Sequence, residues 1–165
     1  MGEIAVKAPS GDREFQLSPE SAEVVEGAAK AVGALVYGRR TFDLAQAWGG
    51  RHPLDVPMVI LTNRVPQEWV KPGSPFTFVT DGIESAIEQA KKIAGKKTVA
   101  VGSGTTTRQS LEAGLLDEIH IDLVPVLLGD GIRLFDHLRA VPVELESTRV
   151  VEAPGVTHLT FRVVK

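Results

Sequence analysis

The chain has 165 residues, 43% of them hydrophobic and 24% charged, which is the balance of one globular domain with a real core. A formal net charge of -3 and only 5% aromatic residues argue against a broad polyanion-binding surface and a base-stacking platform, so nucleic acid is not an expected partner. Without cysteine there are no disulfides, thiolate metal sites or cysteine nucleophiles, and the composition fits a reducing cytoplasm.

The N-terminal residues 1–17 form the least regular part of the sequence. Glu3 to Lys7 is long enough for one short strand, and Arg13 to Leu17 alternates apolar and polar side chains, so a weak hairpin is one option. The same residues lack the basic start and apolar core of a signal peptide. Ser18 followed by Pro19 is typical of a helix N-terminus and predicts a helix from Glu20 to Val32.

Strands and helices are expected to alternate through the middle of the chain. Short apolar runs predict buried strands at 34–37, 57–61 and 76–79, and residues 97–101 are expected to form the next strand. The segments between them predict helices at 39–48, 83–94 and 105–113. Asp81, with Glu84 three residues later, predicts a capping box at the start of the second of these helices.

The last third of the chain predicts antiparallel strands. Residues 119–123 alternate isoleucine or leucine with polar residues, and alternation returns on both sides of the turn at 154–155. The whole order indicates the α/β class, with a mixed, mostly parallel central sheet flanked by helices and an antiparallel C-terminal hairpin. Residues 1–165 are expected to form one domain. The apolar run 119–128 and the hairpin offer more β surface than the helices cover, which predicts a homodimer.

The polar residues do not indicate metal or hydrolytic chemistry. The 4 histidines have no ligand-like spacing, and no order of Ser, His and Asp stands out. His120 and Asp122 share one face of their predicted strand. They are either an acid/base pair or a satisfied polar pair at a packed surface.

Two arginine-bearing segments follow predicted buried strands. In Gly38-Arg39-Arg40-Thr41, the strand turns into a helix whose unpaired N–H groups favour an anion, and arginine adds bidentate contacts to phosphate. A solvated basic pair that caps a turn is the alternative. Thr62-Asn63-Arg64 follows the next strand, at the sheet edge where open α/β sheets bind ligands. Two such segments on one edge favour a nucleotide with a 2′-phosphate.

A third segment, Gly102-Ser103-Gly104-Thr105, also lies between a strand and a helix. Its glycines allow a pyrophosphate to approach the backbone, and its hydroxyls can donate to it. No lysine follows the last glycine, which excludes a Walker A loop, and no third glycine completes a dinucleotide fingerprint. A Rossmann-type protein is therefore the weaker alternative. Gly129-Asp130-Gly131 is explained by a tight turn.

Four segments occur in one order at a spacing that resembles the dihydrofolate reductase-like superfamily. They are Val36–Phe42, Ile60–Arg64, Val101–Gly104 and the stretch from Gly114 to Phe135. The closer resemblance is to the C-terminal reductase domain of bifunctional riboflavin-biosynthesis enzymes, over roughly residues 20 to 165. It implies an NADPH-dependent reductase of a small pteridine- or pyrimidine-like substrate, often a homodimer.

The resemblance also implies a role for each phosphate segment. Gly38, Arg39, Arg40 and Thr41 would contact cofactor phosphates; Thr62, Asn63 and Arg64 would hold the 2′-phosphate region; and Gly102, Ser103, Gly104 and Thr105 would cradle the pyrophosphate. No residue is assigned to catalysis. Met1 to Ser18 lacks the family's Ser-Leu-Asp-Gly-like first strand. A non-catalytic nucleotide-binding or structural member is therefore the alternative. Glu3 to Lys7 is expected to fill the missing strand's place as a short strand, in its own subunit or swapped into a partner.

Overall fold

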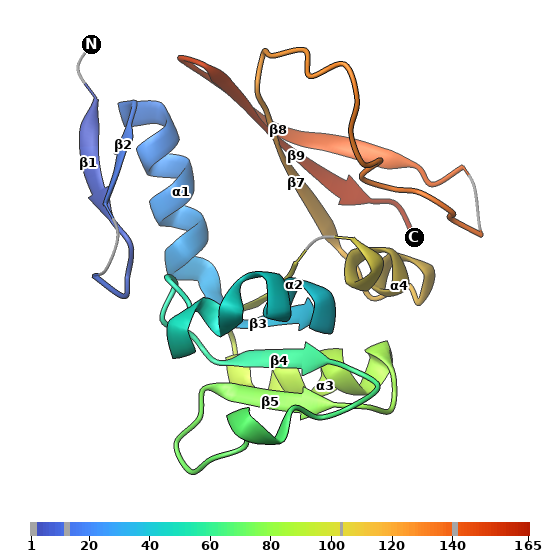
Figure 1. Ribbon diagram of the computed structural model, residues 1–165. Coiled ribbons are helices and arrows are strands. Elements are labelled where there is room, and N and C mark those ends of the chain that lie inside the picture. The colour runs from blue at the N-terminus through green and yellow to red at the C-terminus, as the bar shows by residue number, and fades with distance from the viewer. Residues whose placement is uncertain (1–2, 12–13, 103, 140–141) are drawn as a thin grey trace.

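The computed structural model describes residues 3–11, 14–102, 104–139 and 142–165, and it confirms the predicted α/β class (Figure 1). The strands form a two-stranded hairpin, a four-stranded central sheet and a three-stranded C-terminal sheet. Within the described ranges no helix is long and apolar enough to cross a membrane.

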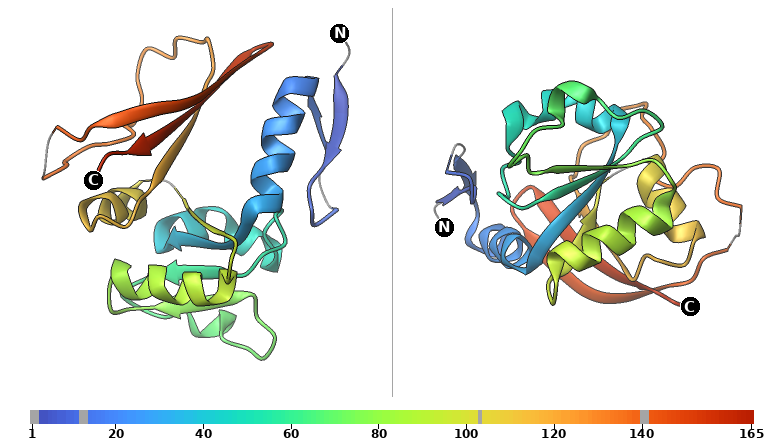
Figure 2. Two further views of the ribbon diagram at one scale, coloured as in Figure 1. Left: turned by 180° about the vertical axis from the view of Figure 1, so that it is seen from behind. Right: turned by 90° about the horizontal axis from the view of Figure 1, so that it is seen from below.

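The central sheet is parallel throughout. Its order is β5 (Phe76–Val79), β4 (Met58–Leu61), β3 (Val32–Gly38) and β6 (Thr98–Val101). These are the predicted strands, with ends that differ by at most two residues. Met58, Val59 and Ile60 are fully buried because helices cover both faces of the sheet (Figure 2).

Helix α3 (Ile83–Ala94) covers one face of the central sheet and has the predicted bounds. Its buried residues recur at helical spacing: Ile83, Ala86, Ile87, Ala90 and Ala94. Burial of Ile87, which is 3% exposed, contributes roughly 1.5–3 kcal/mol. The helix begins after Gly82 with no side-chain cap, so the capping box predicted for Asp81 is wrong.

The other face carries an aromatic core and a helix that ends early. Phe42 of α2 (Arg39–Leu44) packs edge-on against Trp69, Phe76 and Phe78. The predicted helix 39–48 stops at Leu44, and the 3₁₀ segment η1 (Gln46–Gly50) follows. Its first three residues, 46–48, have positive φ, which costs roughly 1–2 kcal/mol each. Burial of Ala47 and packing of Trp48 on Tyr37 offset that cost.

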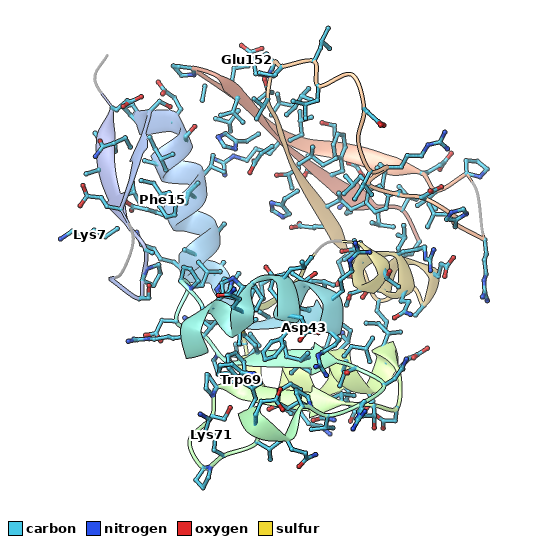
Figure 3. The ribbon with its side chains drawn as sticks, viewed as in Figure 1. Lys7, Phe15, Asp43, Trp69, Lys71 and Glu152 are labelled. Carbon is cyan, nitrogen blue, oxygen red and sulfur yellow. The ribbon has the colours of Figure 1, made fainter. Side chains whose placement is uncertain are left out.

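Antiparallel strands at the C-terminus form a sheet of their own. Its order is β7 (Glu118–Leu123), β9 (Val156–Val163) and β8 (Leu145–Ala153), and Glu152 marks the end of β8 beside the turn into β9 (Figure 3). The described residues between Leu123 and Leu145 form no helix or strand, so the apolar run predicted as one strand over 119–128 ends at Leu123. Helix α4 (Thr105–Glu112) precedes this sheet in the chain.

The N-terminal hairpin lies outside both larger sheets. Strand β1 (Ile4–Lys7) pairs with β2 (Glu14–Leu17) and packs on α1 (Pro19–Ala31), which confirms the hairpin and the helix. The prediction that Glu3–Lys7 fills a place in the central sheet of its own subunit is wrong. Among the described residues, β6 pairs only with β3 and β7 only with β9. Pairing with a segment seven residues away closes a short loop, which costs less entropy than insertion between distant strands.

Candidate functional site

The arginine segments meet at the carboxyl edge of the central sheet. Gly38, the last residue of β3, is paired in register with Leu61, the last residue of β4. On the other side of β3, Val36 is paired with Val101 at the end of β6. Residues that follow these strands therefore lie at the same edge of the sheet, as the sequence predicted.

Two side chains lock the ends of β3 and β4 to each other. Arg39 donates from Nε to Asp43 Oδ1 at 2.7 Å and from Nη1 to the backbone oxygen of Arg64 at 2.9 Å. The buried Thr62 hydroxyl donates to that same oxygen at 2.8 Å and accepts from the Arg64 N–H at 3.2 Å. The hydroxyl proton of Thr62 and much of the Arg39 guanidinium are therefore committed to the turn. These two residues shape the edge.

Arg40 and Arg64 differ from Arg39 because their charges are not matched by a carboxylate. Both are exposed, and neither makes an ion pair in the part of the chain that the structure describes. Asn63 is exposed beside Arg64, and Thr41 is half-buried in the first turn of α2. The edge thus presents two free guanidinium groups, which match phosphate oxygens in geometry and charge.

The glycine segment after β6 packs against β3 more closely than any side chain would permit. Gly102 N–H donates to Val36 O at 2.8 Å, and a Cβ on Gly102 would lie 1.8 Å from the Tyr37 ring. Thr107 donates to Gly102 O at 3.2 Å, and Gly104 has a φ of +76° before the exposed Thr105 begins α4. The predicted Ser103 lies outside the described residues.

The Tyr37 ring beside Gly102 packs against two further aromatic side chains. Tyr37 lies 5.2 Å from Trp48 and 6.0 Å from His52, measured between ring centroids. Burial raises the pKa of the Tyr37 phenol, so the ring stays neutral through physiological pH. Trp48 belongs to the left-handed turn at η1, and this turn places its ring against Tyr37. The sequence pattern did not indicate this turn.

A second polar cluster joins α1 to the C-terminal sheet. His158 Nδ1 lies 2.7 Å from Asp122 Oδ1, and His158 Nε2 lies 2.9 Å from Ser21 Oγ. The predicted pairing of His120 with Asp122 is wrong, because His120 contacts Glu118 at 3.3 Å instead. The register Asp122↔His158 brings these two together from strands that the sequence places 36 residues apart.

Comparison with known proteins identifies the family. The model of the family described as the RibD C-terminal domain matches residues 5–159. The chain belongs to this family. The resemblance to the riboflavin-reductase branch of the dihydrofolate reductase-like superfamily is thereby confirmed.

Solved structures similar to this RibD C-terminal domain share its fold. A putative riboflavin biosynthesis protein from Shewanella sp. PV-4 is 24% identical, with 85% of this chain and 78% of that chain covered and a TM-score of 0.69. A diaminohydroxyphosphoribosylaminopyrimidine deaminase/5-amino-6-(5-phosphoribosylamino)uracil reductase from Thermotoga maritima is 12% identical, with 97% and 53% covered and a TM-score of 0.62. A pyrimidine reductase-like protein from Corynebacterium diphtheriae is 13% identical, with 88% and 81% covered and a TM-score of 0.57.

One curated relative matches over part of its length. The uncharacterized protein YyaP of Bacillus subtilis (strain 168) is 28% identical over 85 residues, which are 51% of this chain and 45% of that protein. The match therefore spans less than half of that relative.

Within the described residues, tightly packed glycines and an unpartnered arginine lie at the edge of this RibD C-terminal domain. The backbone at Gly102 carries no side chain, and at Gly38 a Cβ would lie 2.9 Å from the Thr106 hydroxyl. Nε of Arg108, one turn after Gly104, is buried with no hydrogen-bond partner among the described residues. The two glycines are therefore required by packing inside the protein, and the unmatched guanidinium groups are the feature that fits an anionic ligand.

Proposed function

We propose that this RibD C-terminal domain binds NADPH at the carboxyl edge of its central sheet and reduces a small heterocycle of the pyrimidine or pteridine type. The observation that carries the proposal is the pair of exposed, unmatched arginines, Arg40 and Arg64, at the ends of neighbouring strands. Two structural neighbours, a deaminase/uracil reductase and a pyrimidine reductase-like protein, support the substrate class.

Each segment has a proposed contact. Arg64 and Asn63 hold the 2′-phosphate, with Thr62 and Arg39 keeping their turn in place. Gly38, Arg40 and Thr41 line the phosphates beside α2, and the segment Gly102 to Thr105 receives the pyrophosphate. The bound cofactor supplies a hydride to the substrate.

A second candidate function is a non-catalytic nucleotide-binding member of the same family. One observation favours it: in the described residues, the N-terminal hairpin β1–β2 pairs with no strand of the central sheet. Binding of NADPH without turnover of any pyrimidine or pteridine would select this alternative over the reductase.

NADPH is expected to bind more tightly than NADH, by at least tenfold. A charge-assisted contact to the 2′-phosphate contributes about 1.5–3 kcal/mol, and 1.4 kcal/mol is a factor of ten. Isothermal titration calorimetry of both cofactors at one salt concentration measures the difference. Equal affinities would reject the 2′-phosphate site and with it the proposed cofactor.

We also propose that the protein is a homodimer through the apolar face of its C-terminal sheet. Leu123 and Val150 are 57% and 54% exposed on that face, and Leu127 and Ile132 in the following segment are almost fully exposed. Apolar patches of this kind are usually buried by association. Light scattering at micromolar concentration is expected to give twice the chain mass, and Val150→Glu is expected to reduce it to one chain mass. A monomeric wild type would contradict the proposal.

A further inference from the structure

A cavity lies between the N-terminal hairpin, α1 and the loop that leads into β4. Its volume of about 600 Å³ is within the range of small-molecule sites. The residues that line it are mostly apolar and come from all three segments: Val6, Ala8, Phe15, Val25, Ala29 and Leu54. The cavity therefore has the size and the wall chemistry of a pocket for a small apolar molecule.

The three walls are fixed to one another. β1 and β2 are paired along their whole length, with Val6 opposite Phe15, and both strands pack on α1. The hairpin is joined to the loop because Ser10 N–H donates to Pro53 O at 2.9 Å. The walls therefore need no ligand to hold them in place.

The cavity is closed at its base by the amino ends of two central strands. Val32, the first residue of β3, is 7% exposed, and Lys97 directly precedes β6. Because β3 and β6 are parallel, this end of the sheet is opposite the carboxyl edge to which the cofactor is assigned. A ligand in the cavity would therefore occupy a second site, and the inference does not depend on the proposed function.

Apolar side chains at this cavity remain partly in contact with water. Val6 and Ala8 are 6% and 7% exposed, whereas Phe15 and Val25 are 44% and 38% exposed. Phe15 lies between the hairpin and α1 (Figure 3). Covering these two side chains with an apolar ligand would remove their surface from water, which is favourable.

Most of the charge around the cavity is matched or directed elsewhere. Glu26 is paired with Lys30 at 3.2 Å, and Asp55 accepts from Arg51 Nε at 2.6 Å. Lys7 borders the cavity, but its side chain points away from α1 (Figure 3). These groups therefore give the cavity no net preference for a cation or an anion.

Lys97 differs from them because it makes no ion pair within the part of the chain that the structure describes. The base of its side chain is packed against β3, where a Cβ on Gly33 would lie 2.7 Å from Lys97 Cβ. Its ammonium group extends from this fixed point beside the apolar walls. An ammonium group of this kind pairs with a carboxylate.

We propose that the cavity binds a small monocarboxylate with an apolar body. The apolar body lies against Phe15, Val25 and Ala29, and the carboxylate pairs with the ammonium group of Lys97. The size of the cavity, its apolar walls and its single unmatched ammonium group together define this class of ligand.

Isothermal titration calorimetry with 2-naphthoate tests the proposal, and 2-naphthalenemethanol is the uncharged counterpart. The acid is expected to bind once per chain and about threefold to tenfold more tightly than the alcohol, the usual range for a partly exposed charge pair. Lys97→Gln is expected to remove that difference and to leave binding of the alcohol unchanged. Lys96→Gln is the matched control, because Lys96 is an exposed neighbour that does not border the cavity.

A second pair of variants tests the location. Ala29→Phe places a ring inside the cavity and is expected to weaken 2-naphthoate binding by roughly tenfold or more. Ala28→Phe is its control, because Ala28 is exposed on the same helix and does not border the cavity. Thermal midpoints check that both variants fold. The Lys97→Gln comparison keeps the cavity intact, so it decides the proposal even where Ala29→Phe unfolds.

NMR spectra of the wild type give a readout that needs no variant. His52 lines the cavity, whereas His137 lies in the segment that carries the almost fully exposed Leu127 and Ile132. 2-Naphthoate is expected to shift the ring proton signals of His52 and to leave those of His137 in place.

Four results would each overturn the proposal. They are no binding of 2-naphthoate at millimolar concentration, equal affinities for the acid and the alcohol, equal effects of Ala29→Phe and Ala28→Phe in folded proteins, and a shift of His137 without one of His52. Failure of NADPH to bind would reject the proposed function and leave this site standing.

Discussion

Replacing Arg64 with alanine is expected to weaken NADPH binding about 10- to 100-fold and to leave NADH binding nearly unchanged. Only NADPH carries the 2′-phosphate that the Arg64 guanidinium is proposed to hold. The substitution keeps the Arg64 backbone oxygen, which accepts from Arg39 and Thr62, so the turn between β4 and the following loop survives. The loss is therefore expected in the cofactor's phosphate contact and not in the fold.

Calorimetric titration of both cofactors, with the thermal midpoint as a check on folding, measures this effect. Arg51→Ala is the matched control, because Arg51 is also an exposed arginine and its Nε donates to Asp55 Oδ1 at 2.6 Å. A uniform loss for NADPH and NADH would assign Arg64 to the pyrophosphate. If Arg64→Ala binds NADPH as tightly as the wild type, Arg64 does not contact the cofactor.

Replacing Gly102 with alanine is expected to lower the free energy of unfolding by about 3 kcal/mol, the upper end of the range for overpacking a tight site. The added Cβ would lie 1.8 to 2.5 Å from three atoms of the Tyr37 ring. The ring has little room to withdraw, because Trp48 and His52 pack beside it. The φ of Gly102 is not in the left-handed region, so the cost is steric and not conformational.

Urea unfolding of Gly102→Ala measures the cost, and Gly27→Ala in α1 is its control. A Cβ at Gly27 meets nothing within 4 Å, so alanine there is expected to stabilise the helix by roughly 0.5–1 kcal/mol. The double variant Tyr37→Ala with Gly102→Ala is expected to lose less free energy of unfolding than the two single variants lose together. Additive losses would show that the Tyr37 ring does not set the requirement for glycine.

Local patterns in the sequence predicted the elements and the edge where phosphate residues gather. Apolar runs of four or five residues located β3, β4, β5 and β6, and the periodicity of α3 gave its bounds. Since parallel strands expose their carboxyl ends on one edge, the order of the strands and the arginines that follow them is enough to predict that Arg40 and Arg64 lie together. The pattern could not predict that Thr62 and Arg39 both donate hydrogen bonds to the backbone oxygen of Arg64 and so stabilise the turn after β4.

Long-range pairing decided the rest. His120 and Asp122 are near neighbours in sequence and share a face, yet the carboxylate contacts His158 because antiparallel register places that ring directly opposite it. Ser21 joins them only because α1 crosses the same face. Likewise, Glu3 to Lys7 has the same strand propensity whether it pairs with β2 or lies inside the central sheet. Propensity and alternation act over a few residues, whereas register and docking depend on the free energy of contacts between segments far apart in the chain.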